Sequence, residues 1–190
     1  MDIARKVRQP MRAQTTRAFP VIAAIGGLLL NAACFAAPAA NPEKPSAVKI
    51  AVFDFELDDV TPAASANGVT SSSTGTLEKV SNAARRVLAQ SGRYSLIDVS
   101  KVDAQPVKEK SLRNCNGCEA GIALQLGADQ SLIGVVRRVT MTDYYVWIQI
   151  SDARTGKVLD QQAANFAGSD DGWASGVASL IKHQVLVDQN

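Results

Sequence analysis

The sequence predicts an α/β (α+β) fold: a single domain with a mixed five-stranded sheet and the element order β-α-β-α-β-β-β-α. Strand patterns and helix patterns alternate in the first half of the domain, which indicates parallel strands joined by helices. Two tight connections follow in the second half, and connections this short join antiparallel neighbours. The sequence contains no internal repeat and no second set of core elements. We therefore expect one domain, spanning residues 48–187.

The segment before this domain has the three parts of a secretory signal peptide. A basic lead (Arg5 to Arg17) is followed by an apolar run (Phe19–Leu30) and then by small residues, and this order is typical of export signals. Pro38 blocks cleavage directly before it, so we place the cut after Ala36. Residues 37–47 contain three prolines and no apolar periodicity, which favours a flexible lead. The expected location is a bacterial periplasm.

Two other interpretations of the same segment are less favoured. Lipidation of Cys34 would make the protein a lipoprotein, but Asn31, three residues earlier, fits a lipobox poorly. An uncleaved membrane anchor needs an apolar run of about 18 residues, and Asn31 and the small-residue tail argue against one. We expect no membrane span after cleavage.

Removal of residues 1–36 changes the charge of the protein. They carry five of the 20 Lys and Arg residues and one of the 18 Asp and Glu residues, which leaves 15 basic and 17 acidic groups and a formal charge of −2. The apparent basic character thus belongs to the signal. Overall charge gives no support to a nucleic-acid partner.

The first half of the domain alternates between strands and helices. Val48–Phe55 is a nearly continuous apolar run, typical of a strand buried on both faces, and the acids after it are expected to end it. Val60–Gly75 reads as a long polar loop, and such loops are often functional or disordered. From Thr76 apolar residues recur at helical spacing until Gly92. A short strand (Tyr94–Val99) and a polar loop with one possible helical turn (Ser100–Asn114) follow.

The second half is expected to form a short helix, three antiparallel strands and a closing helix. Along Thr142–Asp152, alternate residues share a face, with Tyr144 on one side and Tyr145 and Trp147 on the other. Gly156 supplies the positive φ of a hairpin turn. The expected elements are a helix over Glu119–Leu126, strands over Ser131–Met141, Thr142–Asp152 and Lys157–Phe166, and a last helix from Asp171 to about Val187.

Four segments, in this order, resemble the TolB N-terminal-like and CsgG-like group of bacterial envelope proteins. They are IAVFDFE (50–56), SGRYSLID (91–98), LGADQSLIGVV (126–136) and ISDARTGKVL (150–159). The resemblance covers residues 48–186 and implies a small α/β domain that assembles or binds in the envelope and does no chemistry. The chain lacks the β-propeller of TolB and the pore-forming insertion of CsgG. With its cysteine pair it is more similar to an uncharacterised family of small exported proteobacterial proteins, which implies no established activity.

Cys115 and Cys118 are the two cysteines of the mature chain and the most specific feature of the sequence. In an oxidising compartment they are expected to form a disulfide, and closing so short a loop contributes about 2 kcal/mol. A redox-active pair is the first alternative, because the start of a helix lowers a thiol pKa; however, the preceding segment is polar, not a buried strand. Zinc needs further ligands, and the only histidine is His183.

Other candidate residues have simpler explanations. Asp54, Glu56, Asp58 and Asp59 suit a hard cation such as Ca²⁺, but their spacing is irregular and a solvated strand end is the favoured interpretation. No motif places a triad partner beside His183, so we expect it on the surface or in packing. Aromatic residues of a central strand, here Tyr144, Tyr145 and Trp147, are more often core than binding surface.

The sequence therefore favours a non-enzymatic periplasmic accessory module that acts through an envelope protein partner. No catalytic residue, cofactor or metal site is expected. The alternatives are a periplasmic thiol-disulfide protein that uses the CxxC pair, and a carrier of a small ligand or metal. The partner surface is expected to include Val60–Gly75 and Lys101–Arg113, the two longest stretches whose polarity the fold does not explain.

Overall fold

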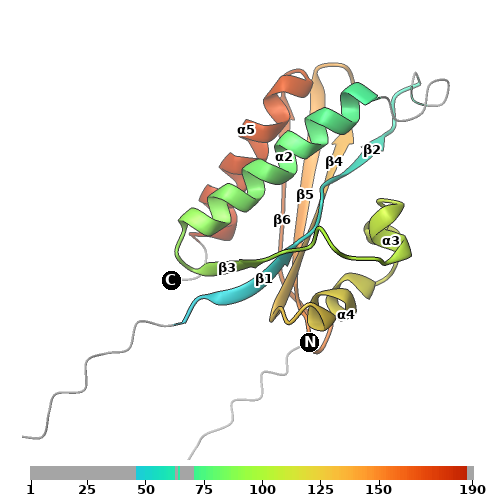
Figure 1. The fold of residues 1–190 in the computed structure, drawn as a ribbon. Coiled ribbons are helices and arrows are strands. Elements are labelled where there is room, and N and C mark those ends of the chain that lie inside the picture. Colours follow the sequence, from blue (N-terminus) through green and yellow to red (C-terminus); the bar gives the residue numbers. More distant parts are fainter. Residues whose placement is uncertain (1–45, 63, 65–70, 188–190) are drawn as a thin grey trace, which may run out of the picture. The chain divides into compact units, whose positions relative to one another are not determined.

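The computed structural model describes residues 46–62, 64 and 71–187, which form a mixed α/β domain around one six-stranded sheet (Figure 1). The strand order is β3-β1-β4-β5-β6, and β2 also pairs with β4. Pairing is parallel among β1, β2, β3 and β4, and antiparallel from β4 to β6. The strands are β1 Val48–Val52, β2 Glu56–Asp59, β3 Tyr94–Ile97, β4 Gln130–Arg138, β5 Asp143–Asp152 and β6 Val158–Ala167. The expected fold class is confirmed, whereas the expected number of five strands is wrong.

The helices lie on both faces of the sheet, with α2 and α5 on one side and α4 on the other (Figure 1). Helix α2 begins at Ser71, so the expected loop over Val60–Gly75 is wrong for its last five residues; residues 63 and 65–70 lie outside the described part. The signal segment and residues 37–45 lie outside it as well. The helices are α2 Ser71–Gln90, α3 Gln105–Lys108, α4 Cys118–Gln125 and α5 Trp173–Leu180, with single 3₁₀ turns at Leu112–Asn114 and Asp170–Gly172 and a π-helical turn at Ile181–Val185.

The sixth strand arises because one run of chain pairs with β4 twice. Val52 lies opposite Leu132, and Glu56 lies opposite Val135, so four steps along β1 and β2 face three steps along β4. One residue is therefore extra, as in a β-bulge, and it switches the side chains from one face of the sheet to the other. The prediction that the acids after Phe55 end the strand is wrong, because Glu56–Asp59 form β2.

Helix α2 satisfies the backbone groups that this irregularity frees. The Ser81 hydroxyl accepts a hydrogen bond from the Phe55 amide at 2.9 Å and is fully buried. The Arg85 guanidinium donates to the Val52 carbonyl at 2.9 and 3.2 Å, and to Asp54 at 2.8 Å. Buried backbone groups without partners are costly, so these two side chains stabilise the junction between β1 and β2.

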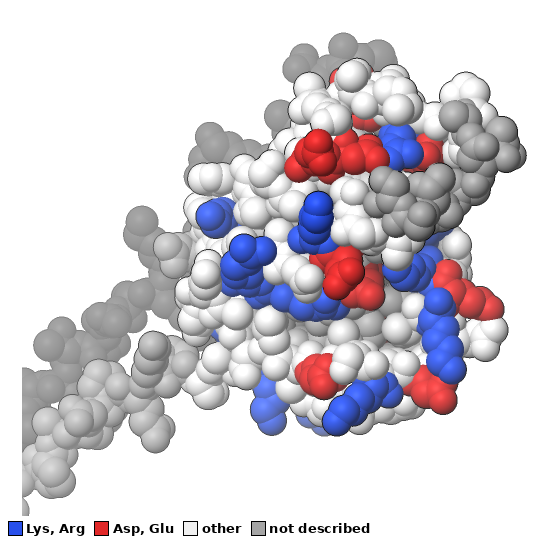
Figure 2. All heavy atoms as spheres, turned by 45° about the horizontal axis from the view of Figure 1, so that its top comes forward, with Lys and Arg blue, Asp and Glu red and all other residues white. Residues whose placement is uncertain are grey.

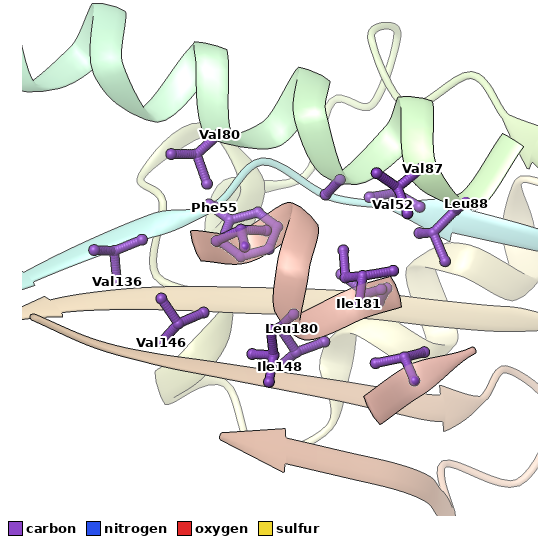
Figure 3. Close-up of a cluster of buried hydrophobic side chains, with 14 of the residues drawn as sticks. Val52, Phe55, Val80, Val87, Leu88, Val136, Val146, Ile148, Leu180 and Ile181 are labelled. Atoms are coloured by element: carbon purple, nitrogen blue, oxygen red, sulfur yellow. The ribbon is translucent and has the colours of Figure 1, made fainter. Parts of the chain in front are cut away.

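The larger part of the core lies between the sheet and helices α2 and α5. Phe55 is fully buried there, in one cluster with aliphatic side chains of α2, α5, β1, β2, β4 and β5 (Figure 3). Gly134 of β4 makes room for the Phe55 ring, because a Cβ at this position would lie 2.2 Å from it. A smaller cluster on the other face includes Phe53, Leu112 and Ala123, with the cysteine pair and Trp147 packed against it.

The second half of the chain forms the predicted elements with different ends: β4 ends at Arg138 and not at Met141, and the last helix is α-helical only over Trp173–Leu180. Tyr144, Val146, Ile148 and Ile150 are buried on the face of α2 and α5, whereas Tyr145 and Trp147 on the opposite face are half-buried. Gly156 has a φ of +71° in the turn before β6. The face that α2 and α5 cover is thus mainly apolar along β5, and Tyr145 and Trp147 point to the other face.

Replacing Ser81 by alanine is expected to lower the free energy of unfolding by about 1–3 kcal/mol, because the buried Phe55 amide loses its acceptor. Urea unfolding followed by circular dichroism measures this difference. Ser179→Ala, on the exposed side of α5, is the matched control and should change the free energy by less than about 0.5 kcal/mol. A Ser81→Ala variant as stable as the wild type would contradict the assignment.

Candidate functional site: a groove beside the cysteine pair

Two rows of side chains cross the sheet on the α4 face and line a groove of about 590 Å³. In the first row Asp58, Arg137 and Tyr145 stand opposite one another on β2, β4 and β5. In the second row Val135 stands opposite Trp147. Asn114 and Arg113 of the 3₁₀ turn complete the lining. We call this the aromatic groove.

Glu56 anchors the turn that forms one wall of the groove. Its carboxylate is 3% exposed and accepts hydrogen bonds from the Leu112 amide at 2.5 Å and from the Arg113 guanidinium at 2.7 Å. A buried carboxylate is tolerated when a cation and backbone donors surround it. Glu56 thus ties β2 to the segment that leads into the cysteine pair, and the expected solvated environment is wrong for this residue.

Each acid of the first-strand cluster forms an ion pair with an arginine. Asp54 pairs with Arg85, Asp58 with Arg137, and Asp59 with Arg138, at 2.6–2.8 Å, in addition to the Glu56–Arg113 pair. Within the described residues, the four carboxylates do not converge on a common point. The Ca²⁺ interpretation therefore has no geometric support, and the acids hold β2 against its neighbours.

Asp59 is the acid of this cluster whose pKa the structure shifts. Burial works to raise its pKa, but hydrogen bonds from Thr61 and the charge of Arg138 outweigh burial, so the pKa of Asp59 lies below its usual value. Arg138 also pairs with Asp170 and lies over the Trp173 ring, 4.9 Å from its centre. This network connects β2 and β4 to the start of α5.

Cys115 and Cys118 lie on a tight turn before α4. Their Cα atoms are 5.5 Å apart and their Sγ atoms are at bonding distance, 2.03 Å. Asn116 and Gly117 between them have φ angles of +53° and +95°, a conformation that the Asn-Gly dipeptide favours. The local sequence is thus suited to bring the two sulfurs together. Formation of the disulfide in the exported protein stays a prediction.

Glu119 is a neighbour of the cysteine pair that the sequence did not single out. It is 2% exposed, and its Oε1 accepts hydrogen bonds from Gln149 Nε2 at 3.3 Å and from Ser151 Oγ at 3.4 Å. Its Oε2 lies 3.8 Å from the Cys115 sulfur. The only available signal was a carboxylate directly after a cysteine at a helix start. Nothing in the chain pattern shows that β5 covers it.

The remaining predicted residues divide between core and surface. Tyr144 is core, as expected, and its hydroxyl donates to the Gly172 carbonyl at 3.0 Å. Tyr145 and Trp147 are not core and instead line the groove. His183 is exposed in the π-helical turn, on the face opposite the cysteines, so it is not placed to join them as a zinc ligand.

Charges of both signs are mixed on the surface that Figure 2 shows, where basic and acidic side chains lie next to one another. The ion pairs of the groove follow the same pattern, because Arg113 and Arg137 each face a carboxylate. The groove therefore combines aromatic rings with partly neutralised guanidinium groups and has no strong field of one sign.

The chain belongs to the family described as "Protein of unknown function (DUF2380)", whose model matches residues 48–185. A search of curated proteins found no match. The matched segment contains all the strands described above, the cysteine pair and the aromatic groove.

Solved structures with a similar arrangement include three bacterial proteins. The C-terminal domain of LpoB from Salmonella enterica is 17% identical, with a TM-score of 0.43 and coverage of 65% of this chain and 85% of that one. Lipoprotein GNA1162 from Neisseria meningitidis is 15% identical, with a TM-score of 0.47, and the match covers 75% of this chain and 99% of that one. TolB from Acinetobacter baumannii is 19% identical, with a TM-score of 0.45, and the match covers 73% of this chain and 28% of that one. Similarity at this level does not identify a function.

Among the described residues, no helix has both the length and the apolar character needed to cross a membrane.

The exported protein is expected to carry a Cys115–Cys118 disulfide, because the compartment is oxidising and the turn brings the two Cα atoms within the usual range. Mass spectrometry of a non-reduced digest should show one peptide containing both cysteines that is lighter by two hydrogens. Alkylation of both thiols in protein isolated directly from the periplasm would contradict the prediction.

Replacing Asp59 by asparagine is expected to lower the free energy of unfolding by about 1–2 kcal/mol near neutral pH. The pKa of Asp59 is lowered in the folded protein, so its contribution is fully present above the unfolded pKa of about 3.9 and is lost as the pH falls through the folded value. Urea unfolding across this range should show the wild type and the variant converging in acid. Asp171→Asn, at an exposed position, is the control. A difference in the free energy of unfolding between wild type and Asp59→Asn that stays constant at every pH would refute the role given to the Asp59 carboxylate.

Proposed function

We propose that this protein is an exported, non-enzymatic accessory module of the bacterial cell envelope that acts by binding a protein partner. The observation that supports this proposal is the aromatic groove, in which Tyr145 and Trp147 are half-buried on the sheet face that α4 covers only in part. Large aromatic side chains in a concave, partly open surface are typical anchors of protein recognition.

The groove is preorganised for such a contact. Tyr145 and Trp147 project from β5, which is paired on both sides along this stretch, so their positions are fixed before a partner arrives. Ala163 of β6 stands opposite Trp147 and is too small to cover its ring. A rigid site loses little conformational freedom on binding, which favours affinity.

Arginine side chains provide the polar part of the surface. Arg137 has a side chain that is 53% exposed, and Arg113 one that is 29% exposed. Each is held by one carboxylate, and a guanidinium has five N–H donors, so donors remain for acceptors on a partner. The chemistry fits a protein segment that offers an apolar side chain beside a carbonyl or carboxylate group.

Of the segment Lys101–Arg113, which the sequence suggested as partner surface, the last residue lines the groove. Arg113 lines both the groove and a second depression of about 450 Å³ next to Leu57, Leu77 and Lys108–Lys110. Of the other suggested stretch, Val60 is 54% exposed and Ser71–Gly75 belong to α2. The contact surface proposed here is therefore the groove together with residues 108–113.

Export is the second part of the proposal and depends on the signal-like order of residues 1–36. Lipidation at Cys34 would instead tether the domain to a membrane through the lead. In both cases the folded domain faces the envelope space, where a protein partner is accessible. The carrier alternative has little to support it, because arginines already neutralise the acids on which it depended.

The test begins with affinity capture of the tagged wild-type protein from its native periplasm, and continues with the purified partner in a calorimetric titration. Replacing Trp147 by alanine is expected to weaken binding by about 2 kcal/mol, or roughly thirtyfold in Kd, as for an interface anchor. The double variant Val158→Ala, Leu159→Ala removes exposed apolar side chains of β6 outside the groove and should bind like the wild type.

The cysteines separate this proposal from a purely redox role. A folded Cys115→Ser, Cys118→Ser variant should retain partner binding, because the sulfurs do not line the groove. Equal binding by wild type and Trp147→Ala would exclude the groove as the contact surface. Repeated failure to capture a partner, together with ligand uptake by the purified protein, would overturn the proposed function.

A further inference from the structure

The environment of Glu119 has no structural explanation in the fold. Glu119 is only 2% exposed. None of the ion pairs among the described residues includes its carboxyl group. Its hydrogen bonds to Gln149 and Ser151 come from neutral groups and are long, at 3.3 and 3.4 Å. Burying a carboxyl group with only neutral partners costs free energy. On the same face of the sheet, the buried Glu56 does have an arginine partner, Arg113.

The two oxygens of Glu119 have different surroundings. Both hydrogen bonds from β5 reach Oε1, whereas Oε2 is directed at the Cys115 sulfur, 3.8 Å away. In the disulfide that sulfur has no proton to donate. In the dithiol, Cys115 gains an S–H group within reach of Oε2. Once the disulfide opens, Oε2 and this sulfur are therefore close enough for one proton to pass between them.

We propose that Cys115, Cys118 and Glu119 form a thiol–disulfide exchange site in which Glu119 carries the proton to and from Cys115. This redox activity is an addition to the partner binding proposed above, which itself involves no chemistry. The co-reactant is a small thiol or a protein dithiol. Cys118 is the first residue of α4, where the helix N-terminus stabilises a thiolate, and Cys115 is the sulfur next to the carboxyl group.

The exchange proceeds in two balanced steps. An external thiolate attacks Cys118 Sγ, which forms a mixed disulfide and breaks the Cys115–Cys118 bond; Cys115 leaves as a thiolate and takes a proton from the Glu119 carboxyl group. A second external thiolate then attacks the external sulfur of the mixed disulfide, so that an external disulfide forms and Cys118 leaves as a thiolate. Two electrons pass from the external thiols to the protein, and solvent returns the proton to Glu119. Oxidation follows the reverse path.

The test compares rates of reduction by dithiothreitol in the oxidised, full-length exported protein, with thiols trapped by alkylation. The native wild type should be reduced faster than the same protein unfolded in urea, since the site accelerates exchange. Glu119→Gln, which keeps the shape but cannot carry the proton, should slow reduction of the native protein by about a hundredfold. It should have no effect in urea. Glu78→Gln, an exposed acid of α2 on the other face, is the matched control and should leave the rate unchanged.

Two results would overturn the proposal. One is a native wild type that is reduced more slowly than the unfolded chain, as a protected structural disulfide is. The other is a folded Glu119→Gln variant that is reduced at the wild-type rate. If that variant does not fold, Glu119→Asp is tested in its place. Its shorter side chain withdraws the carboxyl group from the sulfur, so the rate of reduction should fall by the same factor. If the protein is isolated as the dithiol, oxidation by glutathione disulfide gives the same comparison.

Discussion

The extra residue between β1 and β2 is the constraint on which the rest of the domain depends. It lets one run of chain pair twice with β4, first through Val52 and then through Glu56, and it reverses which residues face each helical layer. Phe55 fits because Gly134 leaves space for its ring, and the Phe55 amide is satisfied by Ser81. After the reversal, Glu56 and Asp58 point to the α4 face. The ion pairs and the groove of that face follow from this one irregularity.

Two buried glutamates on that face show how the same residue type serves different purposes. Glu56 is surrounded by an arginine and two backbone amides and fastens the turn at Leu112–Asn114 to β2. Glu119 has only neutral donors and a sulfur beside it. The first arrangement compensates a buried charge, so a structural role explains it. The second has no arginine and no backbone amide beside it, so the same structural role does not explain it.

The aromatic groove and the cysteine pair occupy one sheet face and are linked by a short stretch of chain. Asn114 lines the groove and directly precedes Cys115, and Trp147 packs against the same small cluster as both cysteines. A partner bound in the groove would therefore lie close to the sulfurs. This arrangement connects the proposed binding surface with the proposed site of covalent chemistry. The Cys→Ser and Trp147→Ala variants separate the two.

The sequence by itself determined the elements whose signals are local. Alternation along β5, the turn at Gly156 and the helical period of α2 are all properties of neighbouring residues, and the structure contains each of them. Tertiary structure alone decided which polar residues are buried and with whom they pair. Ser81 lies on the inner stripe of α2, where it accepts a hydrogen bond from the amide of Phe55, 26 residues earlier. Likewise, Glu56 meets Arg113 across 57 residues, and Glu119 meets Ser151 across 32. Such contacts depend on strand register and on the bulge, which no local pattern encodes.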